Sequence, residues 1–159
     1  MEDRSATATP PQEGWNASTL DQGALQRSLG YNIRQVEIFM NGLFAPMFDA
    51  HGIRPVDYCI LTLLKSNDDV TQTAVAETLH VQRTNLVRSM ARLEAQDLVK
   101  RVTDPADKRN QFLRLTPAGK RKLGEVDHEL ADQEALWTSE FTPEEVDVMI
   151  KLLKRLYSG

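Results

Sequence analysis

The sequence predicts a mainly α-helical protein that carries one small two-stranded β-hairpin. Three observations support this class. Apolar residues recur at steps of three and four near both ends of the chain, which is helical spacing. Two short runs in the second half of the chain have the residue pattern that is typical of strands. Charge is divided along the chain, because 71–122 holds 11 Lys and Arg against 5 Asp and Glu, while the remainder holds 8 against 18.

The bulk composition limits the class of protein. A chain of 159 residues can bury one domain core without disulfides or metals. Cys59 is the only cysteine, so an internal disulfide is excluded and a reducing compartment is expected. No apolar run is long enough to span a membrane, and the N-terminus does not resemble a secretory signal. We therefore expect a cytoplasmic protein whose residues 1–20, rich in Ser, Thr, Pro and Ala, form a flexible tail.

The first two helices are predicted from apolar spacing. A helical stripe runs from Leu25 to Met47, and Pro46 is expected to kink or end this helix. Residues 51–54 break the pattern. A second helix is expected to begin at Pro55, which suits a first helical position, and to end at 66–69.

The middle of the chain alternates short helices and strands. Thr71 can cap a third helix over 72–79, and His80 is expected to take the positive φ of the turn that follows. A fourth helix is predicted at about 83–96. Runs 98–103 and 111–115 are predicted strands, joined by a turn-rich loop at 104–110.

Two further helices complete the chain. Thr116 and Pro117 predict the start of a fifth helix that continues to Trp137. Thr142 and Glu145 have the spacing of a capping box, which predicts a sixth helix directly after them.

The order of helix, turn, helix and hairpin within 71–115 predicts a winged helix-turn-helix, whose second helix fits the major groove of DNA. On that helix Leu86, Met90 and Leu93 are expected to face inward. The polar face that would meet DNA consists of Arg83, Thr84, Asn85, Arg88, Ser89 and Arg92. The alternative is a solvated helix in a winged-helix module that binds protein.

The segments 70–101 and 104–120 resemble the multiple-antibiotic-resistance-regulator (MarR) family of bacterial transcription factors. The most specific match is Asp104-x-x-Asp107-x-Arg109, followed by Leu115-Thr116-x-x-Gly119. The resemblance implies homodimers with interlocking terminal helices, in which each subunit presents one recognition helix and one wing to a pseudo-palindromic operator. It also implies a repressor that a small ligand releases from DNA.

The resemblance implies roles for matching residues. Arg109 would enter the minor groove, and Asp107 would orient it through a charge-assisted bond, unless the pair only shapes the wing. Lys108 would contact phosphate or sugar. The remaining predicted contacts are Thr84, Asn85 and Arg88 to the major groove, Arg83 and Ser89 to the backbone, and Thr71 and Arg92 within the same surface.

The expected organisation has three folded segments after the tail. Residues 21–66 would supply N-terminal helices for dimerisation and the effector pocket, 67–121 the DNA-binding lobe, and 122–159 the C-terminal dimerisation helices. A second copy is expected to cover the apolar faces of the outer helices, since soluble monomers rarely leave such faces open.

An effector is expected between the dimer helices and the DNA-binding lobe. Its predicted contacts are Arg27, Arg34, Phe39, Met40, Phe44, His51 and Tyr58, although most of these suit an ordinary core equally well. Residues 29–34 resemble the corresponding stretch of family members that sense aromatic acids or their coenzyme A thioesters.

Other chemistry finds little support in the sequence. The three histidines, His51, His80 and His128, have no metal-ligand spacing with each other or with Cys59, and no cofactor motif is present. A redox role for Cys59 is not favoured, because a thiol buried among apolar neighbours is inert. No nucleophile–base pattern appears, so an enzyme is not expected. The remaining alternatives are a constitutive DNA binder without an effector and a protein-interaction module.

Overall fold

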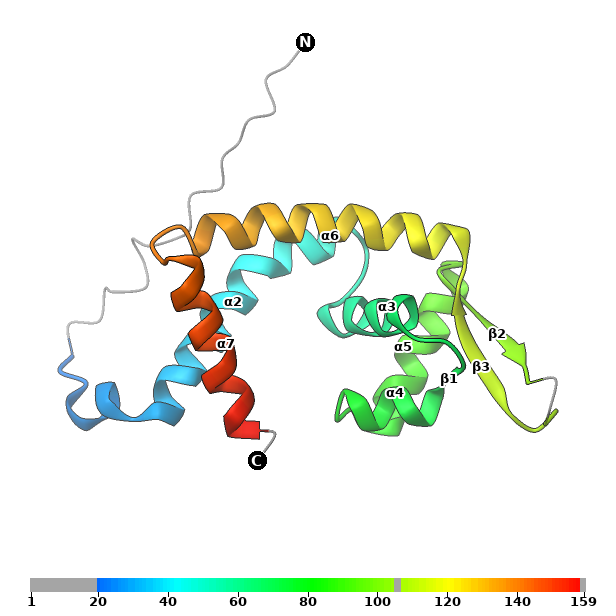
Figure 1. The fold of residues 1–159 in the computed structure, drawn as a ribbon, viewed down its shortest axis with the longest axis horizontal. Helices are drawn as coiled ribbons and strands as arrows, with labels where there is room; N and C mark the ends of the chain where they lie inside the picture. The colour runs from blue at the N-terminus through cyan, green and yellow to red at the C-terminus, as the bar shows by residue number, and fades with distance from the viewer. Residues whose placement is uncertain (1–19, 105–106, 158–159) are drawn as a thin grey trace, which may run out of the picture. The chain divides into compact units, whose positions relative to one another are not determined.

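The computed structural model describes residues 20–104 and 107–157, so residues 1–19 of the expected tail and two residues of the predicted 104–110 turn lie outside it. The elements follow in the order η1 (Gly23–Arg27), α2 (Leu29–Ala50), α3 (Pro55–Ser66), β1 (Val70–Thr71), α4 (Gln72–Thr78), α5 (Arg83–Ala95), β2 (Val99–Thr103), β3 (Gln111–Leu115), α6 (Pro117–Trp137) and α7 (Pro143–Tyr157) (Figure 1). The predicted fold class, mainly helical with a hairpin wing, is confirmed.

Local signals in the sequence account for the starts of three helices and for one turn. Pro55 occupies the first turn of α3. The Thr71 hydroxyl accepts a hydrogen bond from the backbone N–H of Ala74 at 3.2 Å and so caps α4. His80 has the predicted positive φ, 50°. At α7 both bonds of the capping box are present, because Thr142 N–H donates to Glu145 at 2.8 Å and Glu145 N–H donates to Thr142 at 3.3 Å.

One expectation about the first helix is wrong. It begins at Leu29 rather than Leu25, because Gly23–Arg27 form a 3₁₀ turn that ends at Ser28 in an extended conformation. Of the two outcomes expected at Pro46, a kink or an end, the end does not occur, because the helix continues to Ala50. Proline removes one backbone donor, and the buried side chains of Met47 and Phe48 hold the helix beyond that point.

A third strand, β1, was not predicted from the sequence. It consists of Val70 and Thr71, which pair with Leu113 and Phe112 of β3. The sheet therefore has the antiparallel order β1-β3-β2, with β2 and β3 forming the predicted hairpin. A strand of two residues is too short for any periodic pattern.

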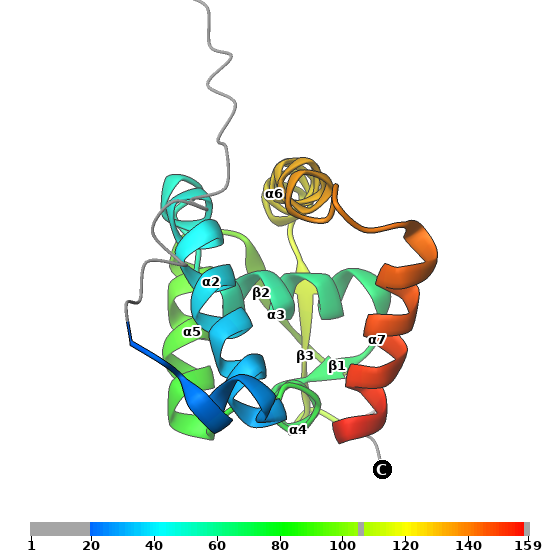
Figure 2. The ribbon, with the colours of Figure 1, turned by 90° about the vertical axis from the view of Figure 1, so that its left-hand side faces the viewer.

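Contacts divide the chain into two units, of which Phe44–His128 is the second. This unit contains α3, α4, α5 and the three strands, which group together in both ribbon views (Figures 1 and 2). Helix α3 packs against α5 and β3. The side chains that are almost fully buried here are Ile60, Leu61, Val75, Leu86, Met90, Leu93, Leu113, Leu123 and Val126. They form the core of this unit, and the buried face of the predicted recognition helix is part of it.

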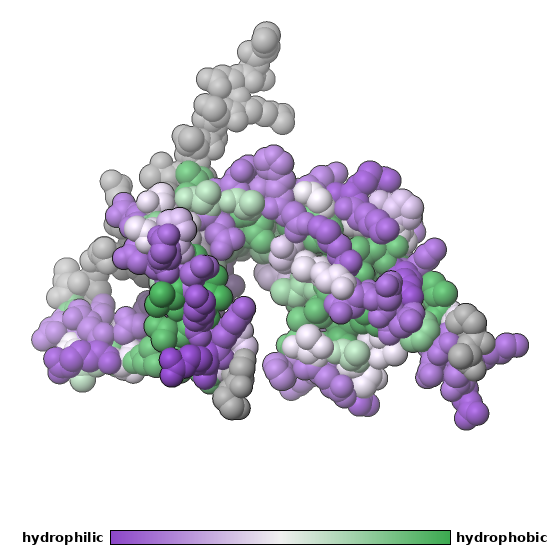
Figure 3. Space-filling view, viewed as in Figure 1, coloured by the Kyte–Doolittle hydropathy of each residue, from purple (hydrophilic) through white to green (hydrophobic). Residues whose placement is uncertain are grey.

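The first unit combines the residues up to Leu43 with those from Glu129 onward. No residue of α7 is buried in the single chain. Large apolar side chains are exposed on α2 and α7, among them Leu29, Ile33, Val36, Leu152, Leu153 and Leu156. Figure 3 shows apolar side chains gathered over α7. None of the described helices has both the length and the apolar character needed to cross a membrane.

Candidate nucleic-acid interface

The predicted recognition helix, α5, has one buried face and one polar face. Leu86, Met90 and Leu93 are almost completely buried, as predicted. The side chains of Arg83, Thr84, Asn85 and Arg88 are exposed, and no acidic residue precedes Glu94 on this helix. The N-terminal turns of α5 therefore offer cationic and hydrogen-bonding groups to a negatively charged partner.

The turn before α5 sets where that face begins. His80 at φ 50° reverses the chain, and Val81 N–H donates to the carbonyl of Ala76 at 3.0 Å. Gln82 is the N-terminal cap residue, and its carbonyl accepts hydrogen bonds from Asn85 and Leu86. A non-glycine residue in the left-handed region is uncommon, and His is among the residues enriched there.

Ser89 does not face outward as predicted, because it is 5% exposed. It lies three residues after Leu86 and four before Leu93, so helical spacing places it on the buried face with them. Direct contact between Ser89 and a DNA backbone is incompatible with this burial.

Arg92 is also not on the open polar face. Its guanidinium contacts Asp57 of α3 with three short distances, Nε–Oδ2 at 3.1 Å and Nη2 to both carboxylate oxygens at 2.7 Å. Asp57 is 0% exposed and also accepts from the backbone N–H of Arg54 at 2.9 Å. The buried carboxylate is fully partnered, and the pair ties the last turn of α5 to the first turn of α3.

The role of Asp57 is not indicated by any pattern in the sequence. It follows Pro55 by two residues at the start of a helix, a position where an acidic side chain suits the helix dipole. That signal indicates a helix start and does not reveal a partner 35 positions later in the chain.

The wing carries its cations at the loop between β2 and β3. The Arg109 side chain is 94% exposed, and Lys108 is exposed beside it. Asp107 accepts a hydrogen bond from the backbone N–H of Arg109 at 3.0 Å, while its carboxylate lies 3.7 Å from Arg109 Nε. Asn110 N–H donates to the Asp107 carbonyl at 2.8 Å, which closes the turn. Asp107 therefore shapes the loop and also faces the guanidinium.

Further cations of the hairpin were not singled out from the sequence. Lys100 and Arg101 of β2 are exposed, and Arg101 Nε donates to Glu94 of α5 at 2.6 Å. The alternation of apolar and polar residues in a strand does not indicate which charged side chains form ion pairs with a neighbouring helix. The ion pair joins the wing to the recognition helix.

A close backbone contact anchors the wing to α6. Thr116 N–H donates to the Leu98 carbonyl at 3.1 Å, and the Thr116 hydroxyl accepts from Gly119 N–H at 2.9 Å. A Cβ atom on Gly119 would lie 2.9 Å from the Leu98 carbonyl carbon and closer still to its oxygen. Glycine is required here because α6 starts directly against the turn that follows α5.

The predicted effector residues fall in both units. In the first unit Arg27 and Arg34 are exposed, with Arg34 3.7 Å from Glu37, while Phe39 and Met40 are half-buried. In the second unit Phe44 is buried, whereas His51 and Tyr58 are half-buried.

Tyr58 has partners inside the second unit. Its hydroxyl donates to Asp127 Oδ1 at 3.1 Å, and Lys65 Nζ donates to Asp127 Oδ2 at 2.9 Å. Its ring lies 6.0 Å from that of Phe48. Burial and the hydrogen bond to Asp127 raise the pKa of Tyr58 above 10.0. These contacts tie α3 to α6.

Cys59 is exposed, although burial was expected from its apolar neighbours. Desolvation of the sulfur raises the pKa of the Cys59 thiol above 9.0, so the thiol stays protonated at neutral pH. Within 20–104 and 107–157, no group of three or more His, Cys, Asp or Glu side chains is placed to hold a metal ion.

Comparison with known proteins agrees with this geometry. A family model described as "MarR family" matches residues 51–110. A "putative transcriptional regulatory protein for hcr operon" from Thauera aromatica is 30% identical over 139 residues, covering 87% of this chain and 84% of its own length. The solved structure of a transcriptional repressor, CouR, bound to a 23-mer DNA duplex is 27% identical, with a TM-score of 0.82 over 87% of this chain and 99% of that chain. The wild-type MarR from E. coli is 25% identical, with a TM-score of 0.67 over 82% of this chain and 97% of that one.

Proposed function

Because this chain belongs to the MarR family of DNA-binding transcriptional regulators, we propose that it is a homodimeric repressor that a small effector releases from a pseudo-palindromic operator. The observation that carries the proposal is the exposed face of α5, formed by Arg83, Thr84, Asn85 and Arg88, together with the fully projecting Arg109 of the wing.

The two cationic elements have different tasks in this proposal. Thr84, Asn85 and Arg88 face the base edges of the major groove, while Arg83 contacts the backbone. Lys108 contacts phosphate or sugar, and Arg109 enters the minor groove. Thr71, whose hydroxyl caps α4, completes the surface that contacts the DNA backbone. Ser89 and Arg92 act through packing and ion pairing instead of direct contact.

A second copy of the chain is the proposed cover for α2 and α7. Leu152, Leu153 and Leu156 are each about half exposed in the single chain. Such apolar faces on two helices are typical of an interface between subunits. Sedimentation equilibrium tests this point, and a single species with the mass of one chain would contradict it.

The proposed effector is a small aromatic acid or its coenzyme A thioester. The support consists of Arg27 and Arg34 as anion partners and of apolar and aromatic groups that include Phe39, Met40 and Phe44, with His51 and Tyr58 as polar groups. A regulator also named CouR, from Rhodococcus jostii RHA1, has been solved with p-coumaroyl-CoA. That compound and free p-coumarate are therefore the first probes.

The proposed mechanism is a change in the separation of the two recognition helices. Half-sites on B-DNA repeat at about 34 Å, so a dimer with another separation loses one of its two contacts. To move the protein from mostly bound to mostly free, the effector must favour the released form by about 5 kcal/mol.

Selection of bound fragments from the source genome tests the function. We expect enrichment of a short pseudo-palindromic sequence, and loss of that enrichment with Arg88→Ala while the fold is retained. The absence of DNA binding at low salt would instead support a protein-interaction module. An operator complex that no compound of a metabolite panel weakens would support a constitutive DNA binder.

A further inference from the structure

We propose that the second unit carries a separate binding site for a small aliphatic carboxylate at the base of the wing. The site is a pocket of about 430 Å³ where the end of α3, β3 and the first turns of α6 meet. That volume lies within the range of about 300–1,000 Å³ that is typical of small-molecule sites. Its residues differ from those predicted to contact DNA or the effector.

The charges that line the pocket favour an anion. Lys65, Arg114 and Lys120 come from three different elements, and Asp68 is the one carboxylate among the lining residues. Asp127 already holds the Lys65 ammonium at 2.9 Å. The Lys120 ammonium has no ion pair or hydrogen bond to any residue that the structure describes. Lys120 is therefore available to an incoming ligand.

Arg114 supplies a donor that lacks an acceptor. Its Nη2 is held by Asp69, and its guanidinium lies 5.9 Å from the centre of the Phe112 ring. Its Nη1 is buried without a hydrogen-bond partner, since Asp68 Oδ1 lies 3.8 Å away, which is within ion-pair distance but beyond a hydrogen bond. A buried donor without an acceptor is costly, and a ligand oxygen would satisfy it.

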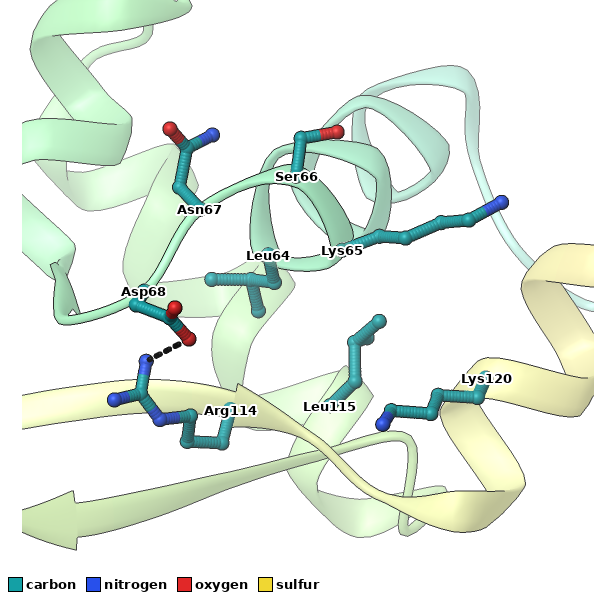
Figure 4. A pocket seen from close by; sticks show the side chains of 8 residues that line it. All are labelled: Leu64, Lys65, Ser66, Asn67, Asp68, Arg114, Leu115 and Lys120. Atoms are coloured by element: carbon teal, nitrogen blue, oxygen red, sulfur yellow. Dashed lines mark ion pairs between the residues drawn. The ribbon is translucent and has the colours of Figure 1, made fainter.

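The apolar lining indicates a carboxylate with a hydrocarbon body. Figure 4 shows Leu64 and Leu115 between Arg114 on one side and Lys120 on the other, with the Lys65 side chain directed away from Arg114. Leu64 and Leu115 are 6% and 9% exposed, and inorganic phosphate would occupy only part of 430 Å³ without using this apolar part of the lining. An aliphatic carboxylate can use the cations and the leucines together.

Occupation of this pocket would act on the wing. Arg114 pairs with Lys100 across the β2–β3 hairpin, and Asp69 and Asp68 link it to the loop before β1. A ligand carboxylate that replaces Asp68 near Nη1 would change how that loop holds β3. The effect on operator affinity depends on the proposed function, whereas binding of the ligand does not.

Calorimetry on the full chain tests the site with hexanoate as the probe, and with hexanamide and inorganic phosphate as matched compounds. We expect saturable binding of hexanoate, and binding of the other two at least about tenfold weaker because each lacks one of the two interactions. Failure of hexanoate to saturate, or equal affinity for phosphate, would overturn the proposal.

Two variants on one helix locate the binding. Lys120→Gln should weaken hexanoate about tenfold, whereas Arg121→Gln, an exposed neighbour with the same change of charge, should leave the affinity unchanged. Equal losses in both variants, or none in Lys120→Gln, would place hexanoate elsewhere and overturn the assignment. Both measurements are made without DNA, so a failed operator experiment would not change the conclusion about hexanoate binding.

Discussion

Three arginines of the predicted DNA-binding segment have the same charge and different surroundings. Arg88 is exposed on α5, Arg109 projects from the wing, and Arg92 holds the buried carboxylate of Asp57. The predicted inward positions of Leu86 and Leu93 are confirmed, but the polar residues were not resolved, since Ser89 is buried and Arg88 and Arg92 have different surroundings. The partner of Arg92 lies in another helix, and pairing between distant segments leaves no periodic signal.

Replacement of Arg109 by alanine should weaken operator binding by about 1–3 kcal/mol without changing stability, because the side chain contacts solvent in the free protein. Fluorescence anisotropy with a labelled operator measures the first quantity, and thermal unfolding the second. Arg121→Ala, which removes one exposed charge of the same basic segment, serves as the control. Equal weakening in both variants would contradict a specific minor-groove contact.

Arg92→Met should lower the free energy of unfolding by about 3 kcal/mol, because it leaves the Asp57 carboxylate buried without its cation. Arg88→Met, one turn earlier on α5, should leave stability within about 0.5 kcal/mol and weaken operator binding instead. Urea unfolding and operator titration of both variants check this division. A stable Arg92→Met protein that has lost DNA binding would instead restore the prediction of direct contact.

At the scale of elements, helix ends with their own capping residues were predictable, and pairings across the chain were not. Pro55, Thr71 and Thr142 mark helix starts. Each signal is visible in the sequence because it depends only on residues a few positions apart. Strand β1 exists only because β3 lies beside it. The same reasoning explains Gly119, which the family motif contains and whose physical reason appears only once Leu98 is placed against it.

Gly119→Ala should destabilise the protein by about 1–3 kcal/mol, because the added methyl group meets the Leu98 backbone, which cannot move aside as a flexible side chain would. Gly124→Ala is the matched control, since Gly124 is exposed on the same helix with nothing within 4 Å of an added Cβ. It should raise stability by up to about 1 kcal/mol. Calorimetric unfolding of both variants measures the difference, and similar results for the two would contradict the close contact.

The stability that Tyr58 contributes by joining α3 to α6 should decrease at alkaline pH. The pKa of Tyr58 is raised in the folded protein, so the folded state retains the phenol proton at a pH where the unfolded chain loses it. The contribution to stability is therefore complete below about pH 10 and is lost as the pH rises through the folded-state pKa.

Tyr58→Phe should cost about 1 kcal/mol at neutral pH, because the hydrogen bond to Asp127 is lost. The difference in stability between this variant and the parent chain should shrink above about pH 10. Urea unfolding at neutral and alkaline pH measures both values. A constant difference across this range would show that Tyr58 does not titrate with unfolding.

At the scale of the whole molecule, the net charge of −4 conceals a basic segment within an acidic chain. The exposed cations of the proposed interface lie in α5 and the wing, as the charge division predicted. The predicted effector residues have a different outcome. They fall in both units of the chain. Whether such residues line a common ligand site depends on how the helices pack, and no sequence pattern describes that packing.

Operator affinity should therefore fall steeply with salt. If Arg83 and Lys108 of two subunits each neutralise one phosphate, the logarithm of the association constant should fall with a slope of about −4 against the logarithm of salt concentration. Lys108→Ala should reduce the magnitude of that slope by about 2 per dimer. Titrations at several salt concentrations check both values, and a slope near zero would contradict backbone contacts by these side chains.

The proline inside α2 has a mechanical consequence. Pro46 has no amide hydrogen, so the carbonyl of Gly42 receives no hydrogen bond from the next turn of the helix. Gly42 itself adds backbone freedom, and the boundary between the two units lies between these residues, after Leu43. The hydrogen-bond ladder of α2 is therefore interrupted within one helical turn of the place where one unit gives way to the other.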